Sequence, residues 1–164
     1  MTTVNNHQTK TSLQLTSPAF EEGGNIPDSY TCQGQNVNPP LNITNVPGAA
    51  ASLALIMHDP DAVSGDFVHW LMWDIPPSTK TIATGNVPSG VIQGLNSASQ
   101  SKYMGPCPPS GTGTHRYMFE LYALDESPKN LDMETSREQL QKAMANHILA
   151  QHTLTGLFSA PTSR

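Results

Sequence analysis

The sequence predicts a mainly β protein built as one domain. Two apolar runs separated by a short loop, ASLALIMHD and FVHWLMWDIP, are typical of a buried hairpin. A third run, HRYMFELYAL, alternates in the way that a strand with two different faces does. Fourteen Pro and twelve Gly in 164 residues indicate many turns. We expect one domain over residues 12–164, preceded by a flexible tail over residues 1–11.

The elements follow from local patterns. Residues 12–20 and 41–48 each contain a short strand, and the two halves of the hairpin cover residues 51–59 and 67–76. Strict alternation along the second half would place Phe67, His69, Leu71 and Trp73 on one face. Residues 85–97 could hide another strand. In the third run, alternation places His115, Tyr117, Phe119 and Leu121 together.

One helix is expected near the C-terminus. Thr135 and Glu138 have the spacing of a capping box, and an apolar stripe at helical intervals follows. The stripe consists of Leu140, Ala143, Met144 and Ile148. His147 and His152 have the wrong spacing to be two ligands on one helical face, so we interpret both as structural or solvent-facing histidines.

Composition excludes several classes of function. The net charge is −5 and no Lys/Arg cluster occurs, so we expect no binding to nucleic acid. No apolar run is long enough to span a bilayer and the N-terminus does not resemble a secretory signal, so we expect a cytoplasmic protein without stable membrane insertion. Cys32 and Cys107 form no CxxC motif, which excludes the usual cysteine-type zinc site. They either pair across two Gly/Pro-rich loops or remain as free thiols.

Several polar side chains lie at the ends of the predicted strands. Asp59 ends the first strand of the hairpin, His69 lies near the start of the second, and His115 and Tyr117 open the third run. Imidazole and phenol groups can donate hydrogen bonds to an oxyanion, and the segment GPCPPSGTGTH can add backbone N–H groups. Asp59 would orient a histidine and keep it protonated. This pattern indicates a pocket for a phosphate-like anion.

The segments HDPDAV, FVHWLMWDIP and GPCPPSGTGTHRYMFELYAL together resemble the signature regions of the phosphatidylethanolamine-binding family, which includes the Raf kinase inhibitor proteins. YTCQGQNVNPPLNI and HILAQHTLTGLF are similar to the bacterial branch of that family, so the resemblance covers roughly residues 13–160. It implies an antiparallel β-sandwich with a large central sheet, a smaller second sheet and a few peripheral helices, including a C-terminal one.

The resemblance also implies a ligand-binding site. Its residues would be Asp59, Asp61, His69, Pro109, His115 and Tyr117, with no cofactor. The family's ligands are anions such as phosphate, a phosphorylated headgroup or acetate, and its members modulate kinases or proteases; a homodimer is expected for bacterial relatives. Two positions depart from the family pattern: Val63 replaces a proline, and Phe158 replaces a tyrosine near the C-terminus. A cis peptide bond is expected near Asp59-Pro60 and near Pro108-Pro109.

Three functions remain open on this basis. The first is a binding protein without catalytic activity, because no nucleophile with a general base, GxSxG motif or P-loop occurs. The second is a metal-dependent enzyme that uses His69, His115 and Asp59, since two histidines and a carboxylate are a common ligand set. The third is a structural or interaction domain whose histidines satisfy only their own hydrogen bonds.

Overall fold

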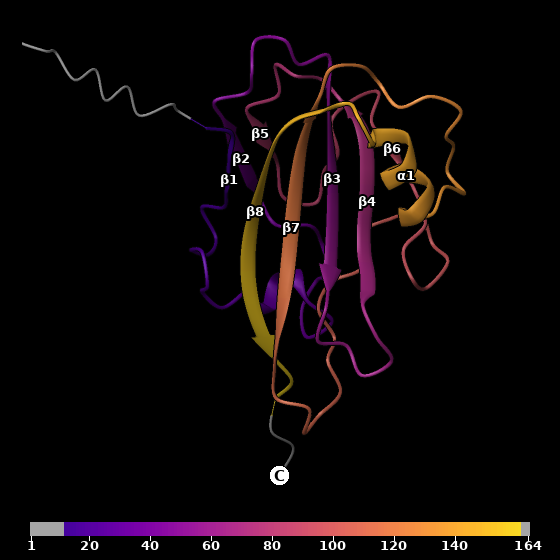
Figure 1. The fold of residues 1–164 in the computed structure, drawn as a ribbon. Coiled ribbons are helices and arrows are strands. Elements are labelled where there is room, and N and C mark those ends of the chain that lie inside the picture. The colour runs from indigo at the N-terminus through magenta and orange to yellow at the C-terminus, as the bar shows by residue number, and fades with distance from the viewer. Residues whose placement is uncertain (1–11, 162–164) are drawn as a thin grey trace, which may run out of the picture.

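A computed structural model describes residues 12–161 of the chain, and the predicted tail over residues 1–11 lies outside them. Eight strands form two antiparallel sheets (Figure 1). The large sheet has the order β6-β4-β3-β7-β8 and the small sheet the order β1-β2-β5. The strands are β1 (Gln14–Thr16), β2 (Leu41–Thr44), β3 (Ser52–Asp59), β4 (Phe67–Ile75), β5 (Thr81–Ile82), β6 (Ile92–Gln93), β7 (Thr114–Leu124) and β8 (Ile148–Ser159).

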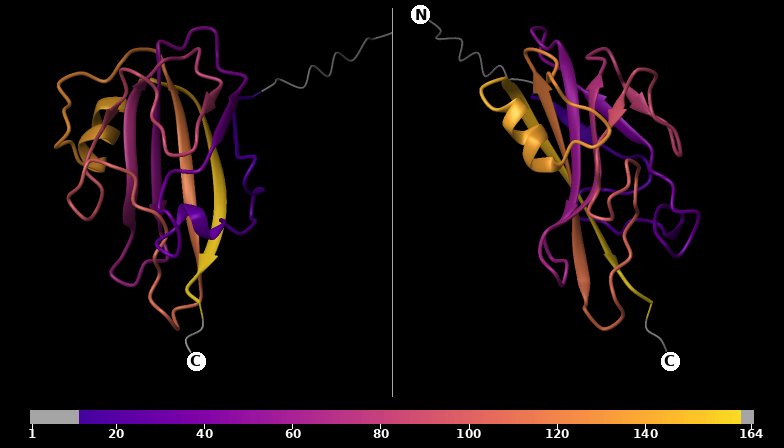
Figure 2. Two further views of the ribbon diagram at one scale, coloured as in Figure 1. Left: turned by 180° about the vertical axis from the view of Figure 1, so that it is seen from behind. Right: turned by 90° about the vertical axis from the view of Figure 1, so that its right-hand side faces the viewer.

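The large sheet is covered on both faces, which confirms the predicted sandwich. One face packs against the small sheet, and apolar side chains from both sheets share a core that includes Leu15, Ile43, Leu55, Trp70 and Phe119. The other face carries helix α1 (Arg137–Met144) and a second core of Ile56, Leu71, Trp73, Leu140 and Met144. The two layers and the helix are seen edge-on in Figure 2. Because β3 is buried on both faces, all eight of its residues are apolar or closely paired polar groups.

Strands β3, β4 and β7 lie where the sequence predicts them, and β6 is the strand expected within residues 85–97. The alternation of β7 is confirmed, because Tyr117, Phe119 and Leu121 all belong to the core between the sheets. The predicted alternation of β4 breaks after His69, since Phe67 and His69 line the cavity whereas Leu71 and Trp73 face the helix. Val68 pairs with His58 and Trp70 with Met57, so one residue of β4 bulges out of register between them. The bulge separates His69 from the face of Leu71 and Trp73 and turns it toward Tyr117.

Helix α1 begins one residue later than predicted. The hydroxyl of Ser136 accepts a hydrogen bond from the backbone of Gln139, whose side chain accepts one from Ser136, so these two residues form the capping box. Thr135 is not the cap because its hydroxyl already accepts the backbone N–H of Asp132. The helix ends at Met144, and Asn146 follows with a φ of 69°.

The C-terminal part of the predicted apolar stripe is a strand. Ile148 is exposed and opens β8, which pairs with β7 along almost its whole length. His147 bonds to Asp125, and His152 accepts the backbone N–H of Leu15, so the structural interpretation of both histidines is confirmed. Besides α1, one 3-10 turn, η1 (Asp28–Tyr30), is present. No helix within residues 12–161 has the length and apolar character that crossing a bilayer would require.

Candidate functional site

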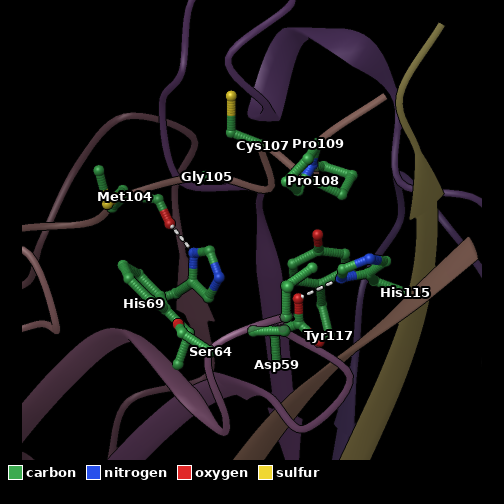
Figure 3. A pocket seen from close by; sticks show the side chains of 13 residues that line it. Asp59, Ser64, His69, Met104, Gly105, Cys107, Pro108, Pro109, His115 and Tyr117 are labelled. Carbon is green, nitrogen blue, oxygen red and sulfur yellow. Dashed lines mark hydrogen bonds and ion pairs between the residues drawn. The ribbon is translucent and has the colours of Figure 1, made fainter. Parts of the chain in front are cut away.

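Three strand ends of the large sheet meet at a cavity of about 270 Å³ on the face that packs against the small sheet. Asp59 comes from the end of β3, His69 from the bulge of β4, and His115 and Tyr117 from the start of β7. Figure 3 shows these four side chains around one central space, with the segment of Gly105 and Pro109 closing its other side. Five of the six residues predicted for the site therefore line one cavity; Asp61 does not.

The side chain of His69 is fixed by a hydrogen bond to the backbone. Its Nδ1 lies 2.6 Å from the carbonyl oxygen of Met104, and because a carbonyl can only accept, Nδ1 carries the proton. The side chain is almost fully buried, and burial lowers the pKa of His69, although the Met104 carbonyl and Asp59 oppose that change. The ring stands edge-on to that of Tyr117, with 5.3 Å between their centroids. This arrangement leaves Nε2 directed into the cavity (Figure 3).

His115 is bonded at both ring nitrogens. Nδ1 lies 2.7 Å from Oδ2 of Asp59, and Nε2 lies 2.9 Å from the hydroxyl of Thr112. The other oxygen of Asp59 accepts the backbone N–H of Asp61, so this carboxylate orients both the imidazole and the following loop. The sequence led us to expect that both histidines donate to a ligand. In the structure, the donors of His115 are already used within the protein.

Asp61 lies outside the cavity wall and holds Arg116. Its carboxylate accepts two hydrogen bonds from the Arg116 guanidinium and one from the Arg116 backbone. These bonds lower the pKa of Asp61 to about 2. The pair therefore anchors the loop after β3 to the start of β7.

Tyr117 lines the cavity with its phenol ring, as the sequence predicts. Burial, together with the nearby Asp59 carboxylate that can accept from its hydroxyl, raises the pKa of Tyr117. The phenol therefore keeps its proton near neutral pH and can donate it to a ligand.

The remaining wall comes from the predicted Gly/Pro segment and from residues 62–64, Phe67 and Met104, which the sequence analysis does not assign to the site. Cys32 and Cys107 form a disulfide, which ties the cavity segment to the loop after η1. At Gly105 a side chain would overlap the backbone carbonyl of Tyr30, so only glycine allows this close approach. Only general burial and turn patterns marked residues 62–64, Phe67 and Met104 in the sequence.

The expected cis peptide bonds are absent from residues 12–161, where every peptide bond is trans. The loop after Asp59 does not need one, because the bond from the Asp61 backbone to the Asp59 carboxylate already closes a tight turn.

The two departures from the family pattern lie in different environments. Val63 is on the rim of the cavity and is 72% exposed. Phe158 is buried in the core between the sheets, opposite His115 on the neighbouring strand, and is not part of the cavity wall. Val63 is therefore the departure from the family pattern that changes the cavity wall itself.

The metal-site alternative conflicts with the observed bonding. Asp59 and His115 bond to each other, and only one nitrogen of His69 is open to the cavity, so a metal ion would have to break the Asp59–His115 pair to gain three ligands. Within residues 12–161, no group of three or more Cys, His, Asp or Glu side chains has the arrangement of a metal site.

Comparisons with known proteins agree with this fold. The model of the family described as phosphatidylethanolamine-binding protein matches residues 16–159. A UPF0098 protein from Methanothermobacter thermautotrophicus is 44% identical over 151 residues, covering 89% of this chain and 98% of its own. The crystal structure of a phosphatidylethanolamine-binding protein homologue from Chlamydia trachomatis has a TM-score of 0.85 at 39% identity, covering 91% of this chain and 98% of its own.

Escherichia coli YbcL, described as a new member of the mammalian family, also has a TM-score of 0.85, at 25% identity, with 91% of this chain and 99% of its own covered. These relatives include archaeal as well as bacterial proteins, so the similarity extends beyond the bacterial branch. The chain belongs to the phosphatidylethanolamine-binding protein family.

Proposed function

We propose that this protein binds a phosphate-like anionic group in the cavity between His69, His115 and Tyr117, without catalytic turnover. The observation that supports the proposal is the convergence of these three side chains on one small, preformed cavity. The cavity is large enough for one phosphate group and part of what it is attached to, such as a small molecule, a headgroup or a phosphorylated protein segment. A nucleophile paired with a general base is missing from the described wall, which favours binding over catalysis.

The chemistry of the wall supports a small ligand. Apolar side chains such as Phe67, Met104 and the two prolines surround the few polar groups, which is typical of small-molecule sites. The kinase or protease partner and the homodimer that the family resemblance implies remain predictions, as does the cytoplasmic location.

Inorganic phosphate is the probe that tests this proposal. We expect isothermal titration calorimetry at neutral pH to show one site per chain. Tyr117→Phe should weaken phosphate binding about tenfold to hundredfold, because it removes one hydrogen bond to a charged group. His147→Ala removes a histidine outside the cavity and should bind phosphate like the parent protein. If Tyr117→Phe and His69→Ala both fold and bind phosphate like the parent, the cavity is not the site.

A further inference from the structure

The hydrogen bonds around the cavity determine which protons are available to a ligand. The hydroxyl of Thr112 lies 2.7 Å from the carbonyl oxygen of Pro109 and donates its single hydrogen to it. The same hydroxyl lies 2.9 Å from Nε2 of His115, and Nδ1 of His115 donates to the Asp59 carboxylate. Both ring nitrogens of His115 are therefore engaged within the protein, and neither is open to a ligand.

Two polar side-chain atoms deep in the cavity can face a ligand. One is Nε2 of His69, whose proton sits on Nδ1, so that Nε2 presents a lone pair. The other is the hydroxyl of Tyr117, which can donate. The centroids of the two rings are 5.3 Å apart, so one oxyanion group can contact both. Ser64 lies at the exposed rim, where its hydroxyl can rotate either to donate or to accept a hydrogen bond.

The carboxylates near His69 already have partners. Asp59 is hydrogen-bonded to His115, and Asp61, which lies outside the wall, pairs with Arg116. His58 lies on the opposite face of the sheet and is bonded to Asp66 and Glu120. None of the described residues that line the cavity is Lys or Arg. The burial of His69 also disfavours a second proton on its ring.

We infer that the cavity selects an acid group that brings its own proton, whose O–H donates to Nε2 of His69 while a second oxygen of the same group accepts from Tyr117. This inference rests on the proposed function and narrows its ligand class. Hydrogen phosphate and dihydrogen phosphate both satisfy it, as do phosphate monoesters in their monoprotonated form and a protonated carboxylic acid. Sulfate and sulfate esters do not, because they carry no proton near neutral pH. Their oxygens would face the His69 lone pair, which repels them.

The test compares inorganic phosphate with sulfate by titration calorimetry at about pH 7.5. We expect the parent protein to bind phosphate at least about tenfold more tightly than sulfate, which corresponds to one unsatisfied polar contact. His69→Gln places a carboxamide near the position of Nε2, and this group can donate as well as accept. In that variant we expect sulfate to bind within about threefold of phosphate. Tyr117→Phe should weaken both anions and keep the preference, because its hydroxyl donates to either.

A second measurement on the parent protein does not depend on any variant. Titrations at about pH 6.5 in two buffers of different ionisation enthalpy report the protons taken up on binding. We expect sulfate to take up close to one proton per site, because it needs His69 in the charged form, and phosphate to take up close to none. Equal affinities for both anions, a preference that persists in His69→Gln, or equal proton uptake would overturn the inference and leave anion binding intact. Absence of binding by either anion would overturn the proposed function itself.

Discussion

A cluster of charged side chains lies on the helix-covered face of the large sheet, opposite the cavity. One substitution can test how much this cluster contributes to stability. His58 lies on the helix-covered face of the large sheet, where Nδ1 is 2.7 Å from Asp66 and Nε2 is 2.6 Å from Glu120. Arg137 of α1 pairs with Asp66, and the hydroxyl of Tyr122 donates to Glu120. Ionised carboxylates can only accept, so the protonated form of His58 is the one that satisfies both contacts at once.

The perturbation is Glu120→Gln, which keeps the shape and the acceptor but removes the charge. Glu120 accepts two charge-assisted hydrogen bonds, from His58 and Tyr122, and its side chain is 17% exposed. A hydrogen bond to a charged group contributes about 1 kcal/mol more than one between neutral groups. We therefore expect Glu120→Gln to lower the free energy of unfolding by about 2 kcal/mol near pH 6. Glu21→Gln makes the same chemical change at an exposed position and serves as the control.

The pH dependence of this loss has a defined sign. Burial lowers the pKa of His58, but the hydrogen bonds to Glu120 and Asp66 outweigh it, so the pKa is raised above its usual value of 6.5. The stabilisation by this pair is therefore complete below pH 6.5 and is lost as the pH rises through the folded pKa. For Glu120, burial raises the pKa but the bonds from His58 and Tyr122 lower it below 4.5, so its contribution is lost only in acid.

The assay is urea unfolding of the parent, Glu120→Gln and Glu21→Gln at several pH values between 6 and 9. We expect the difference between the parent and Glu120→Gln to be largest near pH 6 and to narrow as the pH rises. A difference that stays constant over this range, or a loss no greater than that of Glu21→Gln, would refute the assignment of His58 as a charged bridge.

Three further predictions concern the cavity wall. Denatured but unreduced protein should contain no free thiol, and replacing Cys32 and Cys107 with serine should cost about 2–4 kcal/mol of stability, since the disulfide closes a long loop; detection of two thiols would contradict the pairing. Gly105→Ala should weaken phosphate binding and lower the melting temperature, because its Cβ would overlap a backbone carbonyl; thermal unfolding that matches the parent would oppose this. Asp61→Asn should leave the cavity groups in place but increase hydrogen exchange of residues 61–66, because it removes the ion pair with Arg116; unchanged exchange would show that this pair does not hold the loop.

The strands with regular patterns could be predicted from the sequence, and the details that build the site could not. The long apolar runs of β3 and β4 and the alternation of β7 placed Asp59, His115 and Tyr117 correctly, because a side chain's face follows from its position in a regular strand. His69 reaches the cavity only through the bulge in β4, and a bulge depends on the register with the partner strand, which the local sequence does not encode.

Other features depended on contacts between distant segments. Ile148 continues the apolar spacing of α1 and was therefore assigned to the helix, but it opens β8, which pairs with β7 along eleven positions. Asp61 matched the family's motif, but the bidentate contact with Arg116 directs it away from the cavity. The cysteines could be paired or free on sequence grounds, since pairing requires two loops that lie 75 residues apart in the chain to meet.

The loop between β3 and β4 connects the Asp59–His115 pair at the cavity with the cluster around His58 on the opposite face of the large sheet. It begins at Asp59, whose carboxylate holds His115 on the cavity face, and it ends at Asp66, which holds His58 on the opposite face. Because His58 and Asp59 are neighbours in β3, their side chains point to opposite sides of the sheet and fix the two ends of the loop from different sides. Val63, the exposed part of the cavity rim, lies between these anchors. If this loop moved as a unit, the buried hydrogen bond between Asp59 and His115 would have to break. The cavity is therefore a preformed site rather than one that a ligand must assemble.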